Sequence, residues 1–315
     1  MKKNLRQAVE LYLGTRRSLG FALIKDGFEL RGLVRYAEQI GHTGPLSAQL
    51  AIQWARQPQQ ANQTYWASRL DIVRRFACFW IAYEPRTQIP PRGFFGPPFR
   101  RRAVHVYTRQ EVLTLLKTAS GLGKIHPLRG ETFVTLLGLL DCTGLRIGEA
   151  LGLRGQDIDW AAGVLTIRHA KYGHARLIPV QTSTLEMLRR YQTMRDKAIR
   201  PGLAPKFFVT IRGQPLGYGG VSAVFRGLCR GLGWIQEPVP RLHDLRHTFA
   251  VRTLLAWYRS GQPVEPKLWT LSTYLGHRHL ADTYWYLSAV PELMELCQER
   301  FAAAQVWASG EMNHD

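Results

Sequence analysis

Apolar and polar residues alternate with the period of a helix over the first 83 residues of the chain. Apolar side chains that recur every three or four positions lie on one helix face and can be buried together. Ser47 and Asn62 precede two of these stretches, and both residue types accept hydrogen bonds from the free amides of a helix start. The predicted helices cover residues 3–18, 27–41, 47–57 and 62–83.

The helical pattern stops at residues 84–107, where proline, glycine and arginine replace the periodic apolar residues. Proline lacks a backbone donor and resists helix formation. This composition therefore predicts a basic linker between two domains.

A longer pattern begins at Thr108, which forms a capping box with Glu111 ahead of an apolar run. Two β-rich stretches, 164–169 and 176–180, flank a turn at Tyr172-Gly173 and predict a hairpin. After the first helix, further helices are expected at about 131–142, 183–198, 220–232, 243–260, 266–275 and 281–303. The predicted fold class is mainly α with a small β-sheet, in a small helical domain (1–83), a linker (84–107) and a larger domain (108–315).

The formal net charge of +19 points to a polyanionic partner, because each Lys or Arg that neutralises a phosphate releases counterions. The excess is shared: residues 1–107 hold 17 Lys and Arg against 6 Asp and Glu, and residues 108–315 hold 25 against 17. The run Arg100–Arg102 could be a solvated charge run, but between two basic domains we expect it to contact phosphates.

The lengths of the apolar runs and the spacing of the cysteines indicate the cellular compartment in which we expect the protein. No stretch approaches the roughly 18 apolar residues that span a bilayer. The four cysteines are scattered without a C-x-x-C pair, which favours reduced thiols and a cytoplasmic protein.

Three short strings bring together residues that could grip and attack a phosphodiester. They are Thr143–Leu151, centred on Arg146; His-Asp-Leu-Arg-His at 243–247; and Leu-Gly-His at 275–277, followed nine residues after His277 by Tyr286. Arginine suits phosphate because its guanidinium offers two parallel donors and stays charged at any working pH. Tyrosine suits reversible attack, since phenoxide is a better leaving group than an alkoxide.

Each string also has a simpler interpretation. Arg146 could be a surface arginine paired with Glu149 one turn later, although such a pair would also orient it. His243 and His247, four residues apart, could hold a metal, but no third ligand stands at a recognisable spacing, and His247 is better explained by packing. Tyr284 is the rival nucleophile.

Taken together and in this order, the three strings resemble the tyrosine recombinase (phage integrase) family. The resemblance covers residues 108–303, and weakly 1–83, which would be the DNA core-binding domain. The family's site residues would correspond to Arg146, Lys171, His243, Arg246, His277 and Tyr286. The resemblance implies a site-specific recombinase that cleaves and rejoins DNA through a 3′-phosphotyrosine, without a metal or other cofactor.

The resemblance also implies a role for each site residue. Tyr286 would attack the scissile phosphate while His243 takes its proton. Arg146 and Arg246 would hold the non-bridging oxygens, and the imidazole of His277 would hydrogen-bond one of them.

Lys171 would protonate the leaving 5′ oxygen, but its surroundings depart from the family's Gly-Lys-Gly-x-Lys-x-Arg pattern. Ala170, Tyr172 and His174 replace the first glycine, the second glycine and the second lysine, whereas Arg176 keeps its place. A lysine at a hairpin tip is ordinarily a solvated charge, so this role rests on the resemblance alone.

The implied partners are double-stranded DNA with recombination core sites and further copies of the chain, assembled as a tetramer in the synapse. The biological task would be integration or excision of a mobile element, or replicon resolution. A type IB topoisomerase-like enzyme and a catalytically silent DNA-binding accessory protein are the alternatives. The apolar stretch 301–307 could pack on its own domain or dock into a neighbouring subunit.

Overall fold

The computed structural model describes residues 4–99, 103–168, 175–199, 206–277, 279–289, 291–296 and 298–299. The chain divides into two compact units, Met1–Arg102 and Ala103–Asp315. Each unit has its own buried core, as expected for a chain long enough for two domains.

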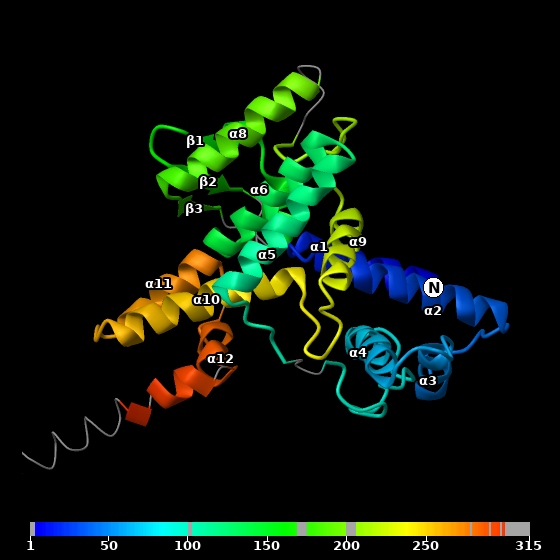
Figure 1. Cartoon of the computed structure of the whole chain (residues 1–315). Helices are drawn as coiled ribbons and strands as arrows, with labels where there is room; N and C mark the ends of the chain where they lie inside the picture. The colour runs from blue at the N-terminus through cyan, green and yellow to red at the C-terminus, as the bar shows by residue number, and fades with distance from the viewer. Residues whose placement is uncertain are drawn as a thin grey trace, which may run out of the picture. The chain divides into compact units, whose positions relative to one another are not determined.

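The first unit is built from four helices. They are α1 (Leu5–Ser18), α2 (Ile24–Gln39), α3 (Ala48–Arg56) and α4 (Gln63–Trp80) (Figure 1). The predicted caps are confirmed, since Ser47 accepts from the amide of Leu50 and Asn62 from that of Tyr65. Apolar faces of all four helices meet in one core in which Trp54 is fully buried.

Much of the predicted linker packs on this first core. Phe95 is buried in the cluster and Ile89 lies against it. The amide of Gln88 also donates to the carbonyl of Leu46 (2.8 Å). The boundary between the two units falls at 102/103, because the aromatic and aliphatic residues inside the proline-rich segment supply buried contacts that its composition hides.

The second unit is mainly helical with a three-stranded sheet, as predicted. In chain order its elements are α5 (Arg109–Ser120), η1 (Gly121–Lys124), α6 (Pro127–Thr143), α7 (Ile147–Gly152), η2 (Gly155–Asp157), β1 (Ile158–Asp159), β2 (Val164–Ile167), β3 (Arg176–Pro179), α8 (Thr182–Ala198), α9 (Tyr218–Gly231), α10 (Leu242–Arg259), α11 (Glu265–Leu275) and α12 (Ala281–Ala289). Strand β2 pairs antiparallel with β1 and β3, and Leu165 opposite Ile178 turns a buried face inward.

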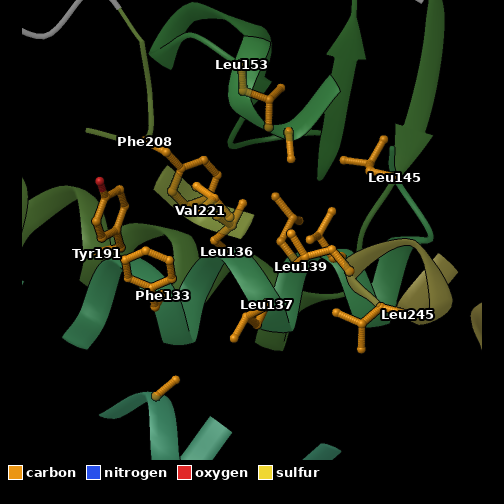
Figure 2. Packing of buried hydrophobic residues seen from close by; sticks show 14 of the residues in the cluster. Phe133, Leu136, Leu137, Leu139, Leu145, Leu153, Tyr191, Phe208, Val221 and Leu245 are labelled. Carbon is orange, nitrogen blue, oxygen red and sulfur yellow. The ribbon is translucent and has the colours of Figure 1, made fainter. Parts of the chain in front are cut away.

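Helix α6 is the centre of the larger core. Figure 2 shows side chains of α6 meeting Tyr191 of α8, Val221 of α9 and Phe208 from the segment between these two helices. A second cluster joins α10, α11 and α12 and includes Tyr286. The helices that carry the His-x-x-Arg and tyrosine strings are therefore packed into one unit.

Several predicted helix bounds differ from the structure: α4, for example, ends at Trp80 instead of 83. Helix α6 starts at Pro127 instead of about 131, because proline is well tolerated in the first turn, where its missing donor has no partner. Helix α2 starts at Ile24 and ends at Gln39, about two or three residues before the predicted 27–41 at each end. The stretch 301–307 lies outside the described residues. Over the described part of the chain, no helix is both long and apolar enough to cross a membrane.

Candidate active site

Gly144 allows the chain to turn sharply between α6 and α7. It caps α6 with φ +61°, and a Cβ at this position would lie 2.5 Å from Cδ1 of Phe249. Only glycine meets both conditions without strain. The turn places Arg146 two residues later as the N-cap of α7.

We expect Gly144→Ala to destabilise the fold by about 2 kcal/mol or more, because the substitution adds left-handed backbone strain to a collision with a packed ring. Thermal or denaturant unfolding of the purified protein measures this. Gly148→Ala is the matched control, since Gly148 lies inside α7 with open space around it and should gain slightly from alanine's helix propensity. Equal stabilities of the two variants would contradict this account of the turn.

A buried carboxylate organises two arginines beside this turn. Glu149 accepts from the Arg146 backbone amide (2.9 Å) and from its Nη1 (3.1 Å), so the predicted pair is present. It also accepts two hydrogen bonds, of 2.9 and 2.8 Å, from the guanidinium of Arg176 on β3. Burial alone would raise the pKa of Glu149, but these donors hold it below the usual value. Glu149 is therefore ionised and orients Arg146.

The carbonyl groups at the end of α11 accept hydrogen bonds from Arg146 and from a further arginine, Arg246. Arg146 donates through Nη1 to Leu275 O (3.2 Å) and through Nη2 to Gly276 O (2.9 Å). Arg246 donates through Nη2 to Leu275 O (2.6 Å) and through Nη1 to Gly144 O (2.8 Å). Because Arg146 and Arg246 share one carbonyl acceptor, their guanidinium groups lie side by side.

This proximity has an electrostatic cost. Arg246 is only 2% exposed, and burial together with the charge of Arg146 lowers its pKa to about 10. It remains protonated at neutral pH. Glu149 accepts from the guanidinium groups of Arg146 and Arg176, and Arg246 joins this network through the carbonyl of Leu275 that it shares with Arg146. An anion placed between Arg146 and Arg246 would relieve their repulsion.

Tyr286 lies inside this cluster and Tyr284 does not. Tyr286 is 2% exposed, whereas Tyr284 is 48% exposed. Burial raises the pKa of the Tyr286 phenol, and the neighbouring Arg246 and Arg146 act in the opposite direction. The Tyr286 hydroxyl lies 3.1 Å from Nδ1 of His247. The prediction that His247 is only a packing position was therefore incomplete.

His277 follows the αL residue Gly276 that caps α11, as the sequence predicted. Its Nδ1 lies 2.8 Å from Oγ1 of the buried Thr283, and its ring is 6.2 Å from that of Tyr286. Burial, and then the charges of Arg246 and Arg146, lower the pKa of His277 to about 3. A neutral imidazole at this place can offer one N–H donor.

His243 stands in the first turn of α10 and is exposed. Its ring packs edge-on against that of His247, with the centroids 4.6 Å apart. Within the described ranges, no three His, Cys, Asp or Glu side chains gather closely enough to hold a metal ion. The ring contact and the tyrosine bond give these two histidines other partners than a metal.

The structure thus brings Arg146, Arg246, His277 and Tyr286 around the end of α11, whereas Lys171 lies outside the described residues. Sequence reasoning missed the roles of three supporting side chains: Arg176, His247 and Thr283. Arg176 left a signal, because it kept its place in a pattern that was otherwise altered. The helical spacing of His247 and Thr283 alone did not indicate their roles.

Comparisons with known proteins bear directly on this arrangement. The phage integrase family profile matches residues 105–292. The protein y4rB of Sinorhizobium fredii, named as a candidate integrase/recombinase, is 40% identical over 306 residues, covering 94% of this chain and 96% of the relative. Tyrosine recombinase XerD of Staphylococcus saprophyticus is 26% identical over 218 residues, covering 69% of each chain.

Solved structures show the same fold. The Tn1549 transposon integrase, in complex with transposon right end DNA, superposes with a TM-score of 0.66 at 18% identity, covering 94% of this chain and 99% of that one. The lambda integrase dimer bound to a core site gives a TM-score of 0.61 at 17% identity, covering 90% and 77%. On the family match and the 40% identical relative, the chain belongs to the phage integrase family of tyrosine recombinases.

Proposed function

We propose that this site-specific recombinase uses Tyr286 as its nucleophile and the cluster at the end of α11 as its scissile-phosphate site. The observation that carries the proposal is the shared acceptor Leu275 O, which holds the guanidinium groups of Arg146 and Arg246 together. Two adjacent fixed cations suit a phosphate whose negative charge grows during attack. The buried phenol of Tyr286 next to these cations supports its assignment as the attacking group.

In the proposed reaction the Tyr286 oxygen attacks phosphorus and the bond to the 5′ oxygen breaks. A 3′-phosphotyrosine and a free 5′ hydroxyl result. His243 would accept the phenol proton, and Lys171 would protonate the leaving oxygen. The 5′ hydroxyl of a partner strand then attacks the phosphotyrosine, so that the phosphodiester is re-formed and the phenol is released.

His277 would donate one hydrogen bond to a non-bridging oxygen. With Nδ1 accepting from the Thr283 hydroxyl, Nε2 carries the ring proton and can be the donor. The lowered pKa of His277 supports a neutral donor instead of a third full charge beside the two arginines.

The nucleophile would act in its own chain's site. Helix α12 packs against α10 and α11 of the same chain, and its Tyr286 lies beside Arg246 without a second copy. This favours cleavage in cis.

The wider function we propose is integration or excision of a mobile element, or replicon resolution, by a tetramer on paired core sites. The names of y4rB and of the transposon and lambda integrases support this task. Residues 1–83 would contact the DNA core site together with the catalytic domain, and both parts of the chain carry excess positive charge.

We expect DNA affinity to fall steeply with salt, because two basic domains that hold one duplex neutralise many phosphates. For about 6–10 phosphate contacts, raising monovalent salt from roughly 50 to 200 mM should weaken binding about a thousandfold or more. Fluorescence anisotropy with a labelled duplex over a salt series gives the slope. If the slope of log affinity against log salt concentration corresponded to only about one or two phosphate contacts, binding by both domains would be contradicted.

The direct test of the proposed function is a nicked suicide duplex that carries a core site selected from a random duplex library by binding to the protein. Loss of the short fragment beyond the nick traps any covalent complex, which denaturing gel electrophoresis detects. A protein–DNA adduct that maps to Tyr286 by peptide mass spectrometry supports the proposal. Specific binding without an adduct would favour a catalytically silent DNA-binding protein.

A further inference from the structure

We propose that His247 is a positioning residue that holds the hydroxyl of Tyr286 as a hydrogen-bond acceptor and aims its oxygen at the scissile phosphate. This inference rests on the proposed function, because it assigns a second histidine to the same nucleophile. The supporting distance is 3.1 Å between His247 Nδ1 and the Tyr286 hydroxyl.

The ring of His247 is held on several sides. It packs edge-on against the ring of Trp285, with centroids 5.3 Å apart, and against that of His243 at 4.6 Å. The Tyr286 ring lies 5.4 Å away on the same side as the hydrogen bond. A side chain fixed by packing can fix its partner, which is what a nucleophile needs for in-line attack.

The neighbouring guanidinium bears on the direction of the hydrogen bond. Arg246 lies beside the Tyr286 oxygen and partly offsets the burial that raises the pKa of the phenol, so the oxygen accepts a hydrogen bond from Arg246. A guanidinium has no acceptor atom. In this proposal the phenol donates its proton to Nδ1 of His247 before attack, and His243 takes the proton when the oxygen bonds to phosphorus.

The neutral state of His247 distinguishes a positioning role from the role of a general base. Burial, followed by the nearby His243 and Arg241, lowers the pKa of His247 to about 3. A group with this pKa stays neutral at working pH and is a poor proton acceptor in the Brønsted sense. The exposed His243 is left as the group that exchanges protons with solvent.

Two amide substitutions of His247 can test whether Nδ1 is the acceptor. The side-chain oxygen of an Asn at this position would lie near the place of Nδ1, whereas that of a Gln would reach the place of Nε2. We expect His247→Asn to cleave the nicked duplex in single turnover within about tenfold of the wild-type rate. His247→Leu and His247→Gln should each be slower by about a hundredfold, since the hydroxyl loses its acceptor and its aim. DNA affinity should stay close to that of the wild type for all three.

Each alternative outcome has a clear meaning. Wild-type rates for His247→Leu and His247→Gln would overturn the proposal, because the hydrogen bond would then have no role. Equal losses of cleavage rate in His247→Asn and His247→Gln would also overturn the proposal. Neither amide can take up a proton, so this result would identify His247 as the base. If His247→Leu does not fold, the comparison of Asn with Gln decides alone. Absence of adduct from the wild type would instead count against the proposed function.

Discussion

Tyr286→Phe should abolish the covalent protein–DNA adduct while leaving specific DNA binding within about twofold of the wild type. The substitution removes one oxygen from a side chain that is 2% exposed, so the ring still fills its place in the cluster of α10, α11 and α12. The hydroxyl lost is the one that would form the bond to phosphorus, and a water that attacked in its place would leave no protein attached to the DNA. Adduct on a denaturing gel and affinity by anisotropy measure the two effects.

The neighbouring Tyr284 provides a matched control. It lies two residues earlier on α12 and is 48% exposed, outside the cluster. Tyr284→Phe should form the adduct at the wild-type rate. If adduct persists in Tyr286→Phe and is lost in Tyr284→Phe, the assignment of the nucleophile is wrong.

Arg246→Ala should lower the rate of cleavage by about a hundredfold or more, the scale found when a preorganised charge-stabilising group is removed. The guanidinium donates to Gly144 O and Leu275 O, so its loss leaves the buried Gly144 O without this donor, whereas Leu275 O keeps its bond from Arg146. That costs stability, on the order of 1–3 kcal/mol. Single-turnover cleavage at saturating protein and thermal unfolding should be measured together.

Arg246→Lys separates charge from geometry. Lysine keeps a positive charge but replaces the planar guanidinium with a single ammonium group. It therefore cannot donate to Gly144 O, Leu275 O and a phosphate at the same time. We expect cleavage to remain at least about tenfold below the wild type. Arg190→Ala, which removes an exposed arginine paired with Glu131 on the surface, is the control and should cleave normally. Wild-type cleavage by Arg246→Lys would show that charge alone suffices.

Local chemistry made part of the fold predictable. The caps at Ser47, Asn62 and Thr108 depend on one side chain and an amide two or three residues away, so sequence spacing alone predicts them. Gly276 was predictable as a C-cap for the same reason. The start of α6 was missed although Leu128 in its first turn is already buried, because Pro127 and Gly130 in the same turn are residues typical of loops.

Contacts between distant segments were not predictable in this way. The spacing of Arg146 and Glu149 predicted their pair, but the sharing of Glu149 with Arg176 depends on how β3 lies beside α7. Likewise, His247 and Tyr286 are 39 residues apart, and their hydrogen bond follows from the packing of α12 on α10. Helical periodicity shows that such a residue faces inward, and it does not show which atom it meets there.

The carbonyl groups at the end of α11 have a consequence for how the proposed phosphate site would be lost. They hold guanidinium groups that come from three separate places: Arg146 before α7, Arg176 on β3 and Arg246 within α10. If α11 undocks, all three lose acceptors in one event, and of its two carbonyl acceptors Arg246 keeps only Gly144 O. A partly docked α11 is therefore a costly state. Local opening of this single helix end would switch the site off in an all-or-none manner, so catalytic competence should follow the docking equilibrium of α11 more closely than the stability of the whole domain.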